Sequence, residues 1–169
     1  MRNSINRSIQ KRDEWLAAGR LIPKAFLILL TAPPGGFKTW FALAFAGAVS
    51  QGTEFLGRKT SQVDVLYLDL ENPLSVIKQR RAILKLDDNF YLKFWGNWLP
   101  DSPPMIGDSR LEEFAEDQDL LIIFDSFLRF HDAEENNAKQ MAKVFAKLHR
   151  LTKLRRHCNC FASSSQNEK

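Results

Sequence analysis

The chain has 169 residues, of which 44% are apolar, and it carries 24 Lys plus Arg, 20 Asp plus Glu and a formal net charge of +4. This length and composition predict one domain with its own core, and they exclude wholesale disorder and collagen-like sequence. Apolar runs such as residues 26–30 are too short to span a bilayer, and the polar, basic segment 1–11 does not have the pattern of a secretory leader. The two cysteines, Cys158 and Cys160, cannot form a disulfide framework, so we interpret them as reduced thiols of a cytoplasmic protein.

The N-terminal part of the chain contains a polar segment, a strand signal and a helix signal, in that order. Residues 1–24 are expected to be a lead-in with a helix near residues 13–18, and residues 25–169 to form the core domain. The apolar run 26–31 is followed by Pro and Gly residues, which predicts a strand buried on both faces. Residues 38–51 are helix formers, apolar nearly all round, and Gly52 follows them, so we expect a deeply buried helix that ends there.

Strand and helix patterns alternate through the rest of the sequence. We expect strands at residues 63–70, 90–94, 120–124 and 158–162, helices at residues 73–86, 111–115 and 137–156, and an irregular loop at residues 96–108. This alternation predicts an α/β fold, a three-layer parallel β-sheet with helices on both faces. Ligands of such sheets bind outside the carboxyl ends of the strands, so the residues that follow each strand are the candidates for function.

A candidate phosphate loop follows the first strand. Residues 32–39 read A-P-P-G-G-F-K-T, where Walker A would read G-x-x-x-x-G-K-[ST], and Ala32 and Phe37 replace both motif glycines. The two glycines inside the loop can still supply positive φ angles or close backbone approach, and a helix N-terminus favours phosphate. An ordinary strand–turn–helix corner with a surface lysine is the alternative. The expected ATP-binding residues are Pro34, Gly35, Gly36, Phe37, Lys38, Thr39 and Trp40.

Two further strands end in acidic residues. Asp125 follows the run L-L-I-I-F, which is the Walker B arrangement, and with Thr39 it is expected to hold Mg²⁺. Asp69 and Glu71 share one side of an extended strand, and we favour Glu71 as the group that activates water, with Asp69 in support. Either acid is otherwise interpreted as a cap of the helix that begins near Pro73. Glu71 and Lys38 are therefore the candidate catalytic residues.

Several segments in order give the chain a family resemblance. It resembles the RecA-like P-loop ATPases of the AAA type that are related to the plasmid replicative helicase RepA, over roughly residues 22–165. The matching segments are APPGGFKTWFALAFAGAVSQGTEFLG, VDVLYLDLEN, WGNWLP and LLIIFDSFLRFHDAEENNAKQMAKVFAKLHRL.

The resemblance implies ATP and Mg²⁺ as ligands, a catalytic glutamate at Glu71, a Walker B aspartate at Asp125 and a hexameric homo-oligomer. Two departures are visible. The strand after the long helix ends in Ser164, Ser165 and Gln166 instead of the family's polar tip, and the further strands, DNA-facing loops and basic finger of the family do not follow Lys169. We therefore expect a core that is incomplete at its C-terminus, with an exposed sheet edge. Either a partner such as a full-length ATPase covers that edge, or the chain is a shortened gene product or a fragment.

Other features allow a second interpretation. Lys139, Lys143, Lys147, Arg150, Lys153, Arg155 and Arg156 form a basic helix face that binds DNA or is simply solvated. The aromatic residues Phe94, Trp95 and Trp98 stack on a nucleic-acid base or pin their loop to the core. His131, His149 and His157 lack the spacing of metal ligands and are interpreted as surface or loop residues.

These observations predict an ATP-binding RecA-like ATPase, active in a DNA-linked process by family resemblance only. ATP, ADP and DNA are its expected partners, and no membrane is. Three alternatives stay open: a nucleotide-binding remnant or partner subunit that does not hydrolyse ATP, a nucleic-acid binding module with a vestigial phosphate loop, and a small-molecule kinase. The last has no evident arginine-rich lid in the sequence.

Overall fold

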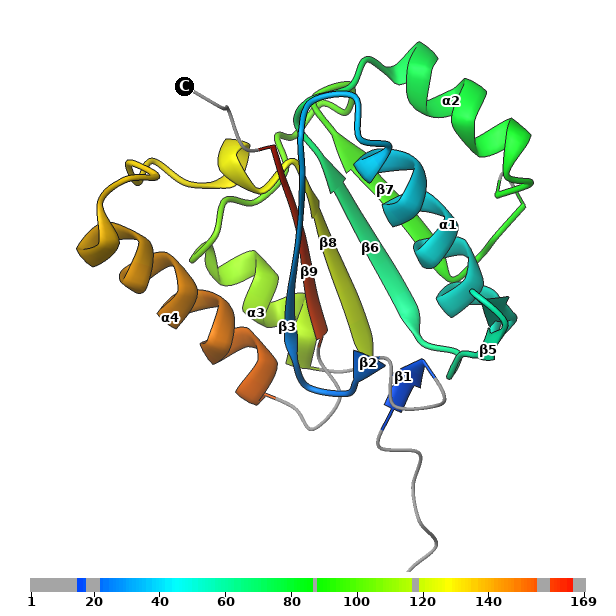
Figure 1. Cartoon of the computed structure of the whole chain (residues 1–169), viewed down its shortest axis with the longest axis horizontal. Coiled ribbons are helices and arrows are strands. Elements are labelled where there is room, and N and C mark those ends of the chain that lie inside the picture. Colours follow the sequence, from blue (N-terminus) through cyan, green and yellow to red (C-terminus); the bar gives the residue numbers. More distant parts are fainter. Residues whose placement is uncertain (1–14, 18–21, 87, 117–118, 155–158, 166–169) are drawn as a thin grey trace, which may run out of the picture.

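The computed structural model describes residues 15–17, 22–86, 88–116, 119–154 and 159–165. A five-stranded parallel sheet with the order β3-β9-β8-β6-β7 lies at its centre (Figure 1). The strands are β3 Leu27–Ala32, β6 Asp64–Asp69, β7 Leu92–Gly96, β8 Leu120–Asp125 and β9 Asn159–Ser165. The predicted α/β class with a parallel sheet is therefore confirmed.

Helices cover both faces of this sheet. Figure 1 shows α1 and α2 on one face, and α3 and α4 on the other. Their bounds are α1 Lys38–Gln51, α2 Leu74–Ile83, α3 Ser109–Glu116 and α4 Ala138–Leu154, and a short 3₁₀ helix η1 spans Phe127–Phe130. Among the described residues, no helix has the length and apolar content that a membrane crossing requires.

The two-residue period of the strands divides the core into two layers. Val65 and Tyr67 of β6 pack with α1, whereas Leu66 and Leu68 of the same strand pack with α3, α4 and η1. The central strand β8 is buried at every position, because it has a strand on each side and helices on each face. The sheet is thereby a fixed platform, and its carboxyl edge positions the loops that follow the strands.

Helix α1 runs through the centre of its layer, as its apolar sequence predicts. Most of its residues after the first turn are buried, and it ends at Gly52, which has a φ of 65°. The N–H of Gly52 donates to the carbonyl of Val49 at 3.2 Å. Since the backbone conformation at this cap is left-handed, glycine is the residue that adopts it without strain.

Two predictions for the N-terminal part of the chain are wrong. Residues Trp15–Ala17 are not helical but form a short strand, β1, which pairs with β2 at Ile22–Pro23 in antiparallel fashion. The strand β3 is not buried on both faces, because it lies at the edge of the described sheet and Leu29 is 43% exposed. An apolar run alone does not distinguish an edge strand from a central one.

The remaining predicted elements are present with shifted ends. The structure adds a small hairpin of β4 Glu54–Phe55 and β5 Arg58–Lys59, which the sequence analysis did not anticipate. Cys160 is fully buried in the core, whereas Cys158 lies outside the described residues. Arg155, Arg156, His157 and Gln166 also lie outside them.

Candidate nucleotide-binding site

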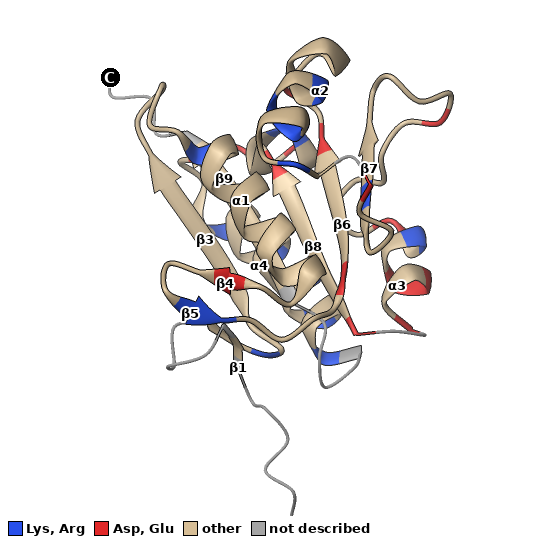
Figure 2. Cartoon of the chain, turned by 90° about the vertical axis from the view of Figure 1, so that its right-hand side faces the viewer, with Lys and Arg blue, Asp and Glu red and all other residues tan. Residues whose placement is uncertain are grey.

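One row of residues at the carboxyl edge of the sheet carries the polar groups of the site. The strand register places Ser163 of β9 beside Asp125 of β8, Asp125 beside Asp69 of β6, and Asp69 beside Gly96 of β7. Both carboxylates are almost fully buried, Asp69 with no exposed surface and Asp125 with 2%. Figure 2 shows acidic residues, in red, at the tips of β6 and β8. Because buried carboxylates must be hydrogen-bonded, their partners define the geometry of the site.

Two hydroxyl groups hold Asp125. The Tyr67 hydroxyl donates to Oδ2 of Asp125 at 2.7 Å, and the Ser163 hydroxyl donates to Oδ1. Burial, and then the negative charge of Asp125, raise the pKa of Tyr67 well above its usual value, so Tyr67 remains a proton donor. The sequence analysis missed both hydroxyl residues, because their role depends on the pairing of β6, β8 and β9 and leaves no local signal.

Asp69 builds the turn after β6. Its Oδ1 accepts the backbone N–H groups of Glu71 at 2.9 Å and Asn72 at 2.8 Å, while its Oδ2 accepts the Asn72 side-chain amide at 3.0 Å. Burial raises the pKa of Asp69 to about 6, against the lowering effect of the two backbone hydrogen bonds. The expected alignment of Asp69 and Glu71 along one strand is wrong, since β6 ends at Asp69. Asp69 faces its own turn, and that turn presents Glu71 to the pocket.

The loop between β3 and α1 uses its glycines in two ways. Gly35 has a φ of 76°, and a side chain on Gly36 would place its Cβ 2.9 Å from both the Ala32 Cβ and the Pro33 carbonyl oxygen. The Gly36 N–H donates to that same carbonyl at 3.0 Å. Phe37 also adopts a positive φ, 56°, although it is not glycine. The two inner glycines thus supply the positive φ and the close approach that the sequence predicts for them.

Lys38 lies inside this loop rather than on the surface. Its Nζ donates to the carbonyls of Ala32 at 2.9 Å and Pro33 at 3.0 Å, and the side chain is only 9% exposed. Lys38 is the first residue of α1, so its ammonium group and the positive end of the helix dipole are close together. This arrangement provides positive potential for an anionic ligand.

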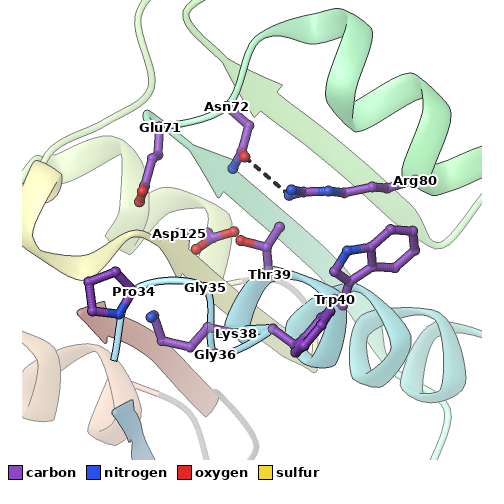
Figure 3. Close-up of a pocket in the computed structure, with 11 residues that line it drawn as sticks. Pro34, Gly35, Gly36, Lys38, Thr39, Trp40, Glu71, Asn72, Arg80 and Asp125 are labelled. Atoms are coloured by element: carbon purple, nitrogen blue, oxygen red, sulfur yellow. Dashed lines mark hydrogen bonds between the residues drawn. The ribbon is translucent and has the colours of Figure 1, made fainter. Parts of the chain in front are cut away.

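These groups line one pocket of about 340 Å³. Figure 3 shows Thr39 and Asp125 pointing toward one another, with Glu71 above them and Lys38 on the side of the loop. Of the residues that the sequence predicts for the site, all but the supporting Asp69 line this pocket, and Asn72 and Arg80 line it as well. Three separate segments of the chain therefore meet at the place where a parallel sheet binds its ligands.

A model of the AAA domain family matches residues 3–162, which is nearly the whole chain. The chain belongs to this family. Among solved structures, it is similar to an ATP synthase subunit, NeqB, from Nanoarcheaum equitans, with a TM-score of 0.56 and 13% identity. That match covers 85% of this chain and 40% of NeqB, so the chain spans less than half of that subunit, and the likeness shows the fold alone. No curated protein matches the chain.

The family supports a P-loop ATPase-type nucleotide-binding function for this AAA domain. Mg²⁺ fits the residues that face the pocket, since the Thr39 hydroxyl and the Asp125 carboxylate are hard oxygen donors. No group of three or more His, Cys, Asp or Glu residues able to hold a metal occurs in the described part of the chain.

Arg80 is a site residue of the AAA domain that the sequence analysis missed. Its NH1 donates to Oδ1 of Asn72 at 3.1 Å, and its guanidinium lies 5.6 Å from the centre of the Trp40 ring. Arg80 thus adds a second cation to the pocket that contains Lys38. The basic character of α2 was visible in the sequence, but which of its cations faces the pocket depends on how α2 packs against α1.

The other candidate residues make contacts within the chain. Trp95 donates its indole N–H to the Asp101 carbonyl at 2.7 Å, and Phe94 packs against Tyr67. Arg150 on the basic face of α4 pairs with Glu112 of α3 at 3.2 Å. His131 accepts the Ala133 N–H through Nδ1, and burial lowers its pKa. These contacts favour the structural interpretation of the aromatic residues over base stacking.

Proposed function

We propose that this AAA domain binds Mg·ATP in the pocket beneath residues 34–40 and hydrolyses it by in-line attack of water on the γ-phosphate. The observation that carries this proposal is the convergence of a buried lysine, a hydroxyl group, a carboxylate at a strand tip and an exposed glutamate on one pocket. A fold corner with a surface lysine would not bury that lysine inside its own loop.

Each residue has a distinct part in this mechanism. Lys38 and the loop amides neutralise charge on the β- and γ-phosphates, and Thr39 with Asp125 would hold the metal ion. When bound, Mg²⁺ stabilises the negative charge that develops on the transferred phosphoryl group. Glu71 orients and deprotonates the attacking water, and the turn built by Asp69 keeps Glu71 at the pocket.

The wider role is proposed from the family resemblance alone. The ordered segments shared with ATPases related to RepA support a DNA-linked process, such as replication, recombination or the movement of a mobile element. The same resemblance supports assembly into a homo-oligomer, a hexamer, or with a longer ATPase. The exposed edge at β3, where Leu29 is 43% exposed, offers a surface for such a partner.

A second candidate function is nucleotide binding without turnover. The observation that favours it is that each Asp125 oxygen already accepts one hydrogen bond, from the Tyr67 or the Ser163 hydroxyl, which weakens the carboxylate as a metal ligand although each oxygen keeps a second lone pair. In this case the chain acts as a partner subunit or a nucleotide-responsive module.

The deciding experiment is phosphate release from Mg·ATP, titrated in protein concentration. We expect turnover in the wild type that rises faster than linearly with protein concentration, no turnover in Lys38→Ala, and turnover lowered at least a hundredfold in Glu71→Gln. Mg·ATP binding should be lost in Lys38→Ala and kept in Glu71→Gln. Binding without turnover in the wild type would favour the second candidate, and absence of binding would overturn both.

A further inference from the structure

The pocket has an aromatic rim that phosphate chemistry does not use. We define the aromatic rim as Phe37 and Trp40, which line the pocket three residues apart at the start of α1. Neither side chain carries a charge that would attract phosphate. Their presence at a polyphosphate site therefore needs a separate explanation.

Phe37 is unfavourable in the free protein on two counts. Its φ of 56° lies in the left-handed region, which disfavours residues other than glycine, and its side chain is 74% exposed. Packing of the Phe37 ring therefore offsets little of the conformational strain, and most of the ring's apolar surface stays in water. The hairpin residue Leu56 combines a similar φ with a similar exposure, so what distinguishes Phe37 is that it lines the pocket, where a bound molecule can supply the compensating contact.

Trp40 is held in a defined orientation at the opposite end of the pocket from the loop. Arg80 lies over its ring at 5.6 Å, and Asn72 in turn fixes Arg80 by a hydrogen bond of 3.1 Å. Figure 3 shows Trp40 and Arg80 side by side at one end, and Pro34 and the Lys38 ammonium at the other. A ligand with its phosphates at Lys38 therefore extends toward Trp40.

We propose that the aromatic rim is a nucleobase subsite, and that Trp40 is its main stacking surface. This inference rests on the proposed function and deepens it, because it states which part of the nucleotide binds where. Stacking on an aromatic ring depends on the area of the base and not on its hydrogen-bonding edge. We therefore expect the subsite to bind purine nucleotides more tightly than pyrimidine nucleotides. The alternative is that Trp40 only packs α1 against α2.

The test compares Mg·ATP with magnesium tripolyphosphate, which has the phosphates but no base. By calorimetric titration, Trp40→Ala should weaken ATP binding by about 5- to 100-fold. Its tripolyphosphate affinity should stay within twofold of the wild type. Trp40→Phe, which keeps an aromatic ring, should recover most of the ATP affinity. Phe90→Ala is the matched control, because Phe90 is 82% exposed and precedes β7 at the opposite edge of the sheet.

The outcomes separate this inference from the proposed function. Equal loss of ATP and tripolyphosphate affinity in Trp40→Ala, or no loss of either, would overturn the base subsite while the phosphate site stands. A wild type that binds neither ligand would instead overturn the proposed function. If Trp40→Ala fails to fold, the wild type decides, since it must bind ATP at least fivefold more tightly than CTP. ATP must also change the tryptophan fluorescence of the wild type, and that response must be lost in Trp40→Phe, which keeps the other three tryptophans.

Discussion

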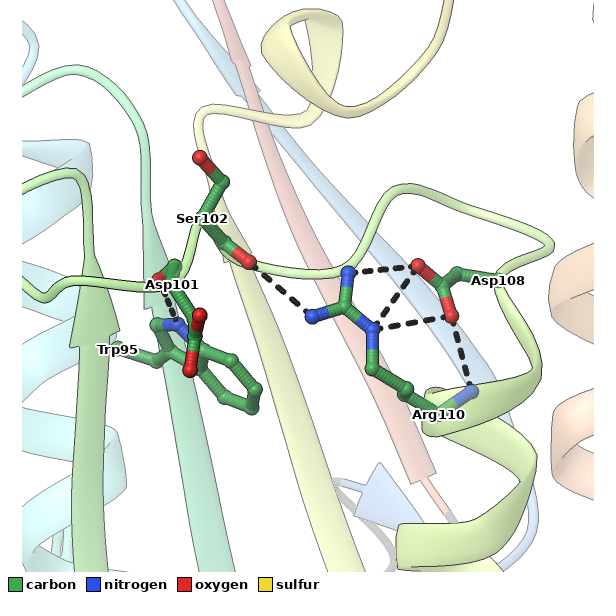
Figure 4. Close-up of polar contacts among 5 residues, drawn as sticks. All are labelled: Trp95, Asp101, Ser102, Asp108 and Arg110. Atoms are coloured by element: carbon green, nitrogen blue, oxygen red, sulfur yellow. Dashed lines mark hydrogen bonds and ion pairs between the residues drawn. The ribbon is translucent and has the colours of Figure 1, made fainter.

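Two loops leave the same edge of the sheet and are stabilised in opposite ways. The loop of residues 97–108, after β7, is fastened by its neighbours: Trp95 donates to the Asp101 carbonyl, and Arg110 donates to the Ser102 carbonyl and to the Asp108 carboxylate (Figure 4). The Trp98 ring also covers Gly96 so closely that a Cβ there would lie 2.3 Å from it. The polar groups of this loop are thus hydrogen-bonded to neighbouring side chains of the same chain. We call residues 97–108 the scaffold loop.

The phosphate loop after β3 shows the contrary arrangement. Residues 33–37 are all exposed. The loop is held by backbone hydrogen bonds from Gly36 to Pro33 and from Phe41 to Phe37, and by the two that Lys38 donates. Apart from the carbonyls of Ala32 and Pro33, which accept from Lys38, no side-chain partner is seen for its backbone among the described residues, and residues 34–37 line a pocket. Of the two loops, the one with few internal contacts lies beside the Lys38 ammonium and close to the end of β8. We therefore expect this loop, and not the scaffold loop, to bind a ligand.

The largest expected change in the free energy of unfolding concerns Asp69. Like the side chains that hold the scaffold loop, it fixes a turn by hydrogen bonds, but its carboxylate is buried. Because burial raises its pKa from 3.8 to about 6, the folded state binds this proton more tightly than the unfolded state. The free energy of unfolding then falls as pH rises from about 4 through 6, by about 3 kcal/mol. Asp69→Asn keeps the Oδ1 acceptor, so we expect it to be about 2 kcal/mol more stable than the wild type at pH 7.5, after the loss of one hydrogen bond to Asn72.

Urea denaturation at pH 4.5 and pH 7.5 measures this effect. The gain of Asp69→Asn should disappear at the lower pH, where the wild-type carboxyl is protonated. If Asp69→Asn were less stable than the wild type at both pH values, the hydrogen bonds of the carboxylate would stabilise the turn by more than burial of its charge destabilises it.

The next effect compares the two loops through their glycines. Gly96→Ala forces the Trp98 ring out of its place, and we expect the free energy of unfolding to fall by about 2–3 kcal/mol. Gly35→Ala meets no atom within 4 Å, so only the backbone strain at its φ of 76° remains, about 1 kcal/mol. Thermal and urea unfolding of both variants measures the difference. Equal losses would show that the scaffold loop is no more tightly fixed than the phosphate loop.

A third effect sharpens the assignment of the two cations at the pocket. Arg80→Gln removes the cation that lies over Trp40, at the end of the pocket away from Lys38 (Figure 3), so we expect the affinity for Mg·ATP to fall by about 5- to 10-fold and that for magnesium tripolyphosphate to fall less. The control is Lys59→Gln on the exposed strand β5. Calorimetric titration measures both ligands. An equal loss for both ligands would assign Arg80 to the phosphates instead of the base.

Most residues of the candidate site could be predicted from the sequence, because each of them directly follows a strand or helix signal in the chain. Lys38 and Thr39 stand next to each other in the chain, and Glu71 and Asp125 each follow an apolar strand signal. Tyr67, Ser163 and Arg80 could not be predicted, because their roles depend on strand pairing and helix packing between distant segments. The same limit explains β3: its apolar run predicts a strand, but only the sheet order makes it an edge.

The smallest effect isolates the strain at Phe37. Phe37→Gly relieves a left-handed backbone conformation and removes an exposed ring, so we expect the free energy of unfolding to rise by about 0.5 kcal/mol. Leu56→Gly is a matched control, because Leu56 has a φ of 51° and is 68% exposed in the hairpin, away from the pocket. Urea denaturation should give both variants a similar gain, while only Phe37→Gly should weaken ATP binding. A loss of stability in Phe37→Gly alone would mean that the Phe37 ring packs on its own chain. The phosphate loop would then resemble the scaffold loop at this residue, because its side chain would stabilise the fold instead of serving a ligand.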